Sequence, residues 1–370
     1  WWGLVREQLK PNDELQKTVD STLKGVDRKD TRKVVAALYN FVVSNTRYVA
    51  LEFGIHGYQP YRVDRVLARR FGDCKDKASL LVAMLKLAGV EADLVLLRMR
   101  HLGQLGSEPA SLSAFNHAIA YVPALDWYLD GTAEFHGATE LPSADRQANV
   151  LVVNGAGEGV FRTTPEAKSD DNPTTMELQV ALTELGAAEV SGSLEVRGQG
   201  APETRRAYQA AGARKHTFEQ AWAQSFPGMS VDELTVSDVT KLEDPVKLGF
   251  KFHAPRWAEA LPSALRFFPF GAGRAFTQAM APLVDRKLDA FFPGVWKNVF
   301  HVTYTAPGGW GVGELPAPLD LTSPFGRFTL TAKVGPDGKL YADGELVFSQ
   351  PRISAKDYPA FRAWLLEVDQ

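Results

Sequence analysis

Cys74 is the only cysteine of the chain, and its surroundings are those of a nucleophile. It follows Asp73, a good N-cap residue, and precedes an apolar stretch at 79–87 whose spacing predicts a helix. At a helix start, unpaired N–H groups and the positive end of the dipole favour a thiolate. We therefore predict that Cys74 is a reactive thiol. The alternative is an inert buried cysteine, which would more often lie further along the apolar face.

A thiol nucleophile needs a base, and the base needs an orienting group. His117 begins an alternating, β-prone segment at 117–122, and Asp130 ends the next short strand. Two adjacent antiparallel strands can place these side chains together on one face, so we predict His117 as base and Asp130 as orienting group. The alternatives are Asp126, at the other end of the predicted hairpin, and His136.

The negative charge that develops on a substrate oxygen needs hydrogen-bond donors. The backbone N–H of Cys74, at the helix start, is one candidate. Gln59, whose amide can donate and which precedes a proline, is a candidate for the second, together with Tyr48 and Tyr58. For the two tyrosines ordinary packing is the alternative.

Five blocks of this sequence resemble the transglutaminase-like superfamily, and more narrowly a bacterial branch in which the core is flanked by β-rich domains of unknown function. The blocks are Arg47-Tyr48-Val49-Ala50-Leu51-Glu52-Phe53-Gly54, Gly57-Tyr58-Gln59-Pro60, Gly72-Asp73-Cys74-Lys75-Asp76-Lys77-Ala78, Phe115-Asn116-His117 and Leu129-Asp130-Gly131-Thr132-Ala133. The aspartate motif of the branch often reads Leu-Asp-Pro-Thr, and here Gly131 replaces the proline. The resemblance is good over 30–155 and is only a pattern of strands over 175–370.

The resemblance implies a papain-like fold with Cys74 as nucleophile, His117 as base and Asp130 as orienting group, and neither cofactor nor metal. Relatives include amide cross-linkers, peptidases, other amidases and members without catalysis. We expect a peptidase or amidase before a protein-glutamine acyl transferase, because hydrolysis of an acyl-enzyme needs only water. The alternative is a non-catalytic cell-envelope binding module, which would not need all three residues.

Composition excludes several classes of protein. The net charge of −3, without long runs of one sign, argues against a nucleic-acid binder. A single cysteine excludes disulfides within the chain and cysteine-rich metal sites. No phosphate-binding loop and no histidine–carboxylate spacing typical of a metal site is present. The longest apolar region, 261–284, is interrupted by Arg266, Arg274 and three prolines, so no membrane span is expected.

A length of 370 residues suggests two or three domains. A polar stretch at 163–174 predicts a linker between a catalytic core at 1–168 and a second domain at 175–370. The fold class is α+β: a papain-like core of helices on an antiparallel sheet, then a β-sandwich-like domain with helical insertions. Its strands are predicted at 176–183, 189–197, 246–253, 299–305, 328–334 and 340–349, before a final helix at 358–366.

Three further expectations concern the surroundings of the protein. The chain opens at Trp1 and Trp2, which suggests a fragment preceded by another β domain. The resemblance implies a periplasmic, cell-envelope or extracellular bacterial protein acting on a protein or peptide. The loop 101–114 is expected to form walls of the substrate cleft, and its sequence does not specify the substrate.

Overall fold

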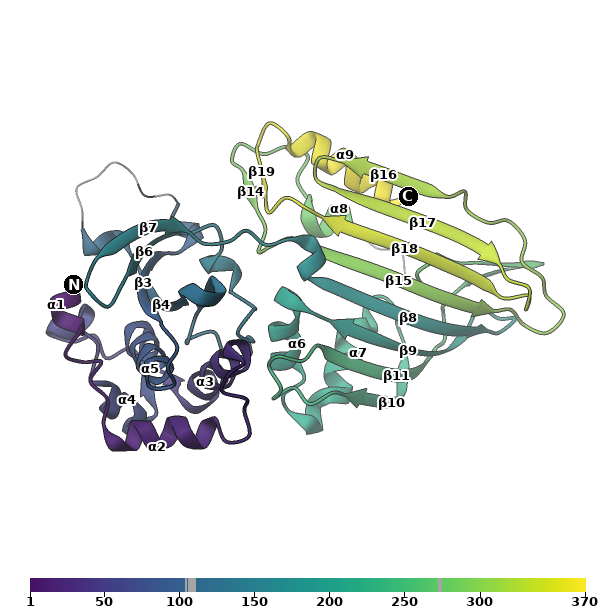
Figure 1. Ribbon diagram of the computed structural model, residues 1–370. Coiled ribbons are helices and arrows are strands. Elements are labelled where there is room, and N and C mark those ends of the chain that lie inside the picture. The colour runs from purple at the N-terminus through teal and green to yellow at the C-terminus, as the bar shows by residue number, and fades with distance from the viewer. Residues whose placement is uncertain (104, 106–110, 272–274) are drawn as a thin grey trace. The chain divides into compact units, whose positions relative to one another are not determined.

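A computed structural model describes residues 1–103, 105, 111–271 and 275–370. The chain forms two compact units (Figure 1). The N-terminal unit comprises residues 1–166 with 241–244, and the C-terminal unit comprises 167–240 and 245–370. Arg274 and part of the predicted cleft loop, 104 and 106–110, lie outside the described residues. Within the described ranges, no helix combines the length and the apolar character needed to cross a bilayer.

The N-terminal unit packs helices on one antiparallel sheet. Its helices are α1 (Trp2–Val5), α2 (Asp13–Thr22), α3 (Thr31–Asn45), α4 (Val63–Arg69) and α5 (Cys74–Leu87). Its sheet has the order β5-β4-β3-β6-β7, from β3 (Asp93–Arg98), β4 (His117–Val122), β5 (Trp127–Leu129), β6 (Asn149–Val153) and β7 (Gly159–Thr163). All neighbouring pairs in this sheet are antiparallel.

Helix α5 is the centre of this unit. It contacts α2, α3, α4 and strand β4, and its residues 75–85 are all buried. Leu81, Val82 and Leu85 are at most 1% exposed, as the apolar spacing predicts. Helix α3 packs beside it and is capped at its N-terminus by Asp30, whose carboxylate accepts the N–H of Lys33 at 3.2 Å. A buried central helix gives its first residue a fixed position.

A two-stranded parallel sheet joins the segment before Cys74 to an upstream segment. Strand β1 (Arg47–Tyr48) pairs with β2 (Phe71–Gly72), with Tyr48 opposite Gly72. Strand β1 ends at Tyr48, and residues 49–53 are not in a strand. The pairing nevertheless brings Tyr48 to the start of α5.

The C-terminal unit is built on one eight-stranded sheet with the order β10-β11-β9-β8-β15-β18-β17-β16. The strands are β8 (Pro173–Leu182), β9 (Ala188–Val196), β10 (Ser230–Val236), β11 (Val246–Ala254), β15 (Trp296–Thr305), β16 (Leu319–Ser323), β17 (Gly326–Val334) and β18 (Leu340–Phe348). Strands β8 and β15 are parallel, and the other neighbours are antiparallel. Short pairs join β12 (Glu259–Leu261) with β13 (Ala264–Arg266), and β14 (Ala290–Phe291) with β19 (Arg352–Ile353).

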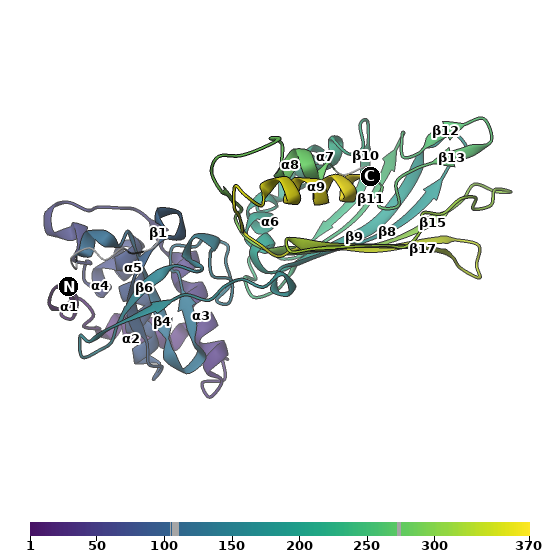
Figure 2. The same cartoon turned by 90° about the horizontal axis from the view of Figure 1, so that it is seen from above.

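Helices cover one face of this sheet. Helices α7 (Arg214–Ala223), α8 (Phe276–Met280) and α9 (Tyr358–Asp369) lie on the same side of it in Figure 2, and α6 (Ala201–Ala207) precedes α7. Phe218, Phe361 and Trp364 bury their rings in the core that the sheet shares with these helices. The α+β class with a β-rich second unit is confirmed. The sequence predicted a sandwich-like arrangement, but helices rather than a second sheet cover the apolar face, since alternation reveals a buried face without revealing what covers it.

Candidate active site

Cys74 is the first residue of α5, as predicted, and its side chain is half-buried. The helix begins with a capping box: the Asp73 carboxylate accepts the N–H of Asp76 at 3.2 Å, and the Asp76 carboxylate accepts the N–H of Asp73 at 3.3 Å. The N–H groups of a first helical turn have no carbonyl partner within the helix. The Cys74 N–H is therefore a donor beside the sulfur.

Asp76 anchors this helix start to its neighbours. Its carboxylate also accepts the backbone N–H of Tyr61 at 2.7 Å and pairs with the Arg69 guanidinium at 2.7 Å. Gly72 makes room for it, because a Cβ on Gly72 would lie 2.6 Å from the Cβ of Asp76. The glycine and both aspartates of the motif thus have structural tasks, and they hold Cys74 in place.

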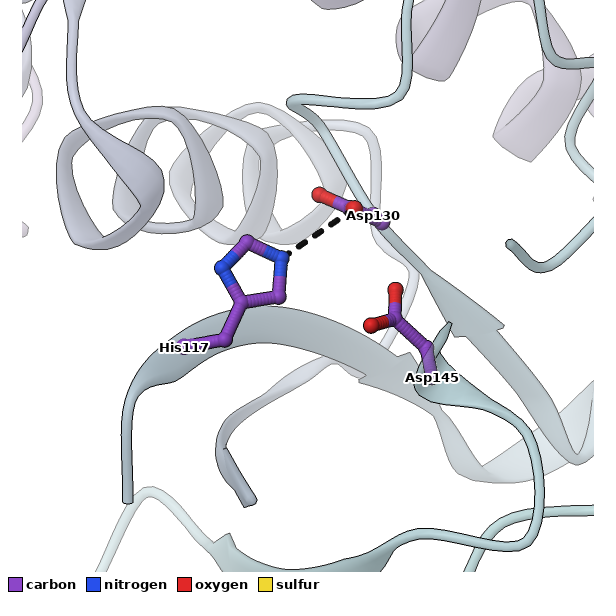
Figure 3. A group of neighbouring side chains, drawn as sticks. All are labelled: His117, Asp130 and Asp145. Carbon is purple, nitrogen blue, oxygen red and sulfur yellow. Dashed lines mark ion pairs between the residues drawn. The ribbon is translucent and has the colours of Figure 1, made fainter. Parts of the chain in front are cut away.

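The hairpin of β4 and β5 brings His117 and Asp130 together (Figure 3). Tyr121 lies opposite Tyr128. Because side chains alternate along strands, His117, four residues before Tyr121, and Asp130, two residues after Tyr128, share one face of the hairpin. His117 Nε2 lies 3.1 Å from Asp130 Oδ2, and both side chains are buried. The contact is an ion pair whose Nε2–H is not aligned as a hydrogen bond.

Thr132 fixes the other oxygen of Asp130. Its backbone N–H and its hydroxyl donate to Asp130 Oδ1 at 2.8 and 2.7 Å. From α3, the Tyr39 hydroxyl donates to the backbone carbonyl of Asp130 at 3.1 Å. These bonds leave Oδ2 directed at the imidazole of His117.

The two partners shift each other's protonation in opposite directions. Burial alone would lower the pKa of His117, but the charge of Asp130 and the contacts with Asp130 and Cys74 raise it well above 6.5. Burial alone would raise the pKa of Asp130, but the charge of His117, the contact with His117 and the hydrogen bonds from Thr132 lower it to about 2. These opposite shifts favour an imidazolium paired with a carboxylate.

A third buried acid, Asp145, lies beside this pair (Figure 3). It ends a short 3-10 turn, Ser143–Asp145, and is 0% exposed. One ligand atom each from His117, Asp130 and Asp145 lies within 4.8 Å of the others, so within the described residues these three form a group that could hold a metal ion. Sequence reasoning missed Asp145, since nothing in the spacing of 117, 130 and 145 reveals such a group.

A cavity of about 200 Å³ opens beside the sulfur. It is lined by Cys74, Lys75, His117 and nine further residues, Trp1, Glu52, Gly57, Tyr58, Leu96, Leu112, Phe115, Asn116 and Ala118. Lys75 is buried, and its ammonium pairs with Asp73 and lies 3.8 Å from Glu52. Cys74 and His117 therefore line a space that is open beside the sulfur.

The candidate donors from the upstream segment lie in different places. Tyr48 is 48% exposed, and burial together with the negative charge of Cys74 raises its pKa to about 12, so its hydroxyl stays a donor. Tyr48 does not line the cavity. The Gln59 amide donates to the Leu4 carbonyl at 3.1 Å, and Gln59 does not line the cavity. Tyr58 lines the cavity, and its carbonyl accepts the indole N–H of Trp1 at 2.8 Å.

The rival base and carboxylate have other partners. Asp126 accepts the hydroxyl of Tyr121 at 2.8 Å at the turn between β4 and β5. His136 Nδ1 lies 3.0 Å from the carbonyl of Glu134. Neither residue lines the cavity beside Cys74.

Two family models match parts of the chain. Residues 17–128 match the model of the transglutaminase-like superfamily, and residues 266–370 match a domain of unknown function with a solved structure, DUF3858. Comparison with curated proteins finds no match.

Solved structures extend the comparison of the fold. A "putative protease" from Parabacteroides distasonis superposes with a TM-score of 0.58 at 13% identity, over 98% of this chain and 55% of its own. This chain thus spans about half the length of that protein. A "putative cysteine protease" from Cytophaga hutchinsonii and an arylamine N-acetyltransferase from Nocardia farcinica, each 17% identical, give TM-scores of 0.28 and 0.21, too low to support an argument. They cover 43% and 48% of this chain, and 50% and 58% of their own. With the match over residues 17–128, the resemblance predicted from the sequence is confirmed: the N-terminal unit of this chain is similar to the transglutaminase-like superfamily over these residues.

Proposed function

We propose that the protein is a thiol-dependent hydrolase of amide bonds, with Cys74 as nucleophile, His117 as general acid and base, and Asp130 as orienting group. One observation carries the proposal: Cys74 begins a capped helix and contacts an imidazole that pairs with Asp130 at 3.1 Å. Because the Asp130 carboxylate pairs with Nε2 of His117, the other ring nitrogen, Nδ1, stays available to the Cys74 sulfur.

The chemistry follows from this arrangement in two stages. The Cys74 thiolate attacks the amide carbonyl carbon and forms a C–S bond. The His117 imidazolium then gives its proton to the leaving nitrogen, so that the C–N bond breaks and a thioester remains. Neutral His117 next takes a proton from water, whose oxygen attacks the thioester carbon. The C–S bond breaks, the product acid leaves, and the thiolate–imidazolium pair is restored.

The oxyanion of each tetrahedral intermediate needs donors close to the sulfur. The Cys74 N–H is the first, and it requires no rearrangement because α5 is buried and capped. We assign the second to the Tyr48 hydroxyl, because β1 pairs Tyr48 with Gly72, two residues before Cys74, and because its raised pKa of about 12 keeps the hydroxyl a donor. The Gln59 amide would first have to leave the Leu4 carbonyl.

The substrate is proposed to be a protein or peptide. A cavity of about 200 Å³ accommodates one side chain or a short segment rather than a whole ligand. Water is the acceptor that needs no additional site, and we therefore favour hydrolysis over transfer to an amine. The resemblance to β-flanked bacterial relatives supports a location in the periplasm or cell envelope.

The test follows acyl transfer through the only thiol of the chain. Wild type and Cys74→Ser are incubated with a mixed peptide library, with and without an added primary amine, and products are read by mass spectrometry. The expected result is new carboxyl termini with wild type alone. Amine adducts would show transamidation in place of hydrolysis. Equal products from both proteins would refute the proposal, and so would the absence of products together with an unreactive thiol, a result that would favour a binding module.

A further inference from the structure

Asp145 is a buried carboxylic acid whose side chain lacks an ordinary partner. Neither of its carboxyl oxygens has a hydrogen-bond donor among the described residues. Its main chain is nevertheless held firmly: its N–H donates to the Pro142 carbonyl at 3.0 Å, and its carbonyl accepts the buried hydroxyl of Thr164. An unpaired buried carboxylate is costly, so its position beside the active site calls for an explanation.

The explanation lies in the second carboxyl group of the cluster. Asp145 and Asp130 each place an oxygen within 4.8 Å of the His117 ring nitrogen, and Figure 3 shows the Asp145 carboxyl group beside the His117–Asp130 pair. Thr132 occupies Oδ1 of Asp130, and His117 faces Oδ2. Oδ2 has a second lone pair, which can accept one more hydrogen bond.

Two buried carboxyl groups with oxygens within 4.8 Å of each other repel strongly when both are ionised, and a single imidazolium offsets only one charge. We propose that Asp145 is a neutral acid whose O–H donates to Asp130, which makes it a positioning residue that holds the Asp130 carboxylate toward His117. This inference rests on the proposed role of the Cys74–His117–Asp130 set. With Asp145 neutral, the cluster of His117, Asp130 and Asp145 carries one positive and one negative charge. The hydrogen bond to Asp130 gives the Asp145 carboxyl group a partner that is neither a solvent molecule nor an ion.

The electrostatics of the cluster agree. Burial and the charge of Asp130 raise the pKa of Asp145 from 3.8 to about 8, although His117 acts in the opposite sense. Other titratable groups near the cluster are Cys74 and Lys77 of α5, Tyr39 of α3, Glu134, Glu140 and Glu243. Lys77 does not neutralise Asp145 directly, because its ammonium donates to the Thr46 carbonyl at 2.7 Å.

Two substitutions separate the neutral donor from an ionised carboxylate. Asp145→Asn keeps the size and a donor, and it should retain the rate of Cys74 alkylation by iodoacetamide near pH 6.5 to within about threefold. Asp145→Leu fills the site without a donor and should lower that rate about tenfold, as expected for losing one hydrogen bond to a charged group. Equal losses in both variants, or no loss in Asp145→Leu, would overturn the proposal.

A second measurement does not depend on reactivity or on how well Asp145→Leu folds. The infrared difference spectrum of wild type minus Asp145→Asn should contain the C=O stretch of a protonated carboxylic acid at pH 6, which fades as the pH rises through about 8. Absence of that band overturns the proposal, as does a stoichiometric divalent metal in wild type that Asp145→Asn lacks. Neither assay needs amide hydrolysis, so a positive result here with no hydrolysis would refute only the proposed function.

Discussion

Gly72→Ala tests whether close packing at the start of α5 fixes the nucleophile. An added Cβ would lie 2.6 Å from the Cβ of Asp76 and 2.8 Å from its Oδ2, whereas ordinary contacts begin at 3.4 Å. Asp76 must therefore move by nearly an ångström. Its Oδ2 would lose the Arg69 guanidinium and the Asp73 N–H, bonded at 2.7 and 3.3 Å.

The size of the effect follows from these two bonds. A hydrogen bond to a charged group contributes about 1.5–3 kcal/mol, so losing two costs about 3–6 kcal/mol. Alanine also lowers the conformational entropy of the unfolded chain, which offsets about 0.4–1 kcal/mol of this cost. The net loss in unfolding free energy of the N-terminal unit is then about 2–6 kcal/mol, which is a large part of the stability of a domain.

Hydrogen exchange of the α5 amides, read by mass spectrometry, measures this loss in the whole chain without assuming two-state unfolding of both units. Exchange in Gly72→Ala should be about 30-fold faster or more, since each 1.4 kcal/mol is a factor of ten. Gly131→Ala is the matched control: it is also buried, and its added Cβ would meet its nearest atom at 3.4 Å. Protection of α5 equal to wild type in Gly72→Ala would show that this contact does not hold the helix start.

Further predictions concern the pair and the domains. His117→Ala should slow Cys74 alkylation at pH 6.5 at least tenfold, because it removes one charge-assisted interaction with the thiolate. An unchanged rate would show that His117 does not activate Cys74. Asp130→Asn places an amide N–H against Nε2 and puts the ring proton on the nitrogen facing the sulfur, so peptide hydrolysis should fall by orders of magnitude, whereas Asp126→Asn should leave it unchanged. The free energy of unfolding that Asp130→Asn loses depends on pH. Asp130 stabilises the folded state above pH 3.8, and this effect disappears as the pH falls toward 2. His117 stabilises the folded state below pH 6.5, and this effect disappears as the pH rises through its raised pKa. Chemical denaturation should therefore show the largest difference between pH 3.8 and 6.5. Residues 1–168 alone should remain folded by circular dichroism and retain thiol reactivity; an unfolded fragment would mean that the two halves share a core.

The sequence was most informative where a local rule decides the structure. Asp73 is an N-cap because a short acidic side chain accepts the free N–H groups of a first turn, and the helix after it begins as predicted. Asp30 caps α3 by the same rule. The hairpin of His117 and Asp130 follows from alternation alone. These local patterns also carry the family resemblance, which the match over residues 17–128 confirms.

Other features depend on contacts between distant segments, which local patterns do not encode. Asp145 lies in a short turn without periodicity, and only the folding of three separate segments brings it beside His117. Gln59 could donate by residue type, but its amide contacts the carbonyl of Leu4, 55 positions earlier. The single large sheet of the C-terminal unit likewise depends on β15 pairing with β8, more than a hundred residues upstream.

The lone thiol of this chain also determines how the protein would respond to oxidants. Cys74 is half-buried beside a cavity, and it is the only cysteine in 370 residues. A sulfenic acid formed there has no second thiol in the chain with which to close a protective disulfide. Its recovery would depend on a thiol from outside, such as a small reductant or another protein. Without one, further oxidation to the sulfinic acid would permanently remove the thiol that we propose as the nucleophile.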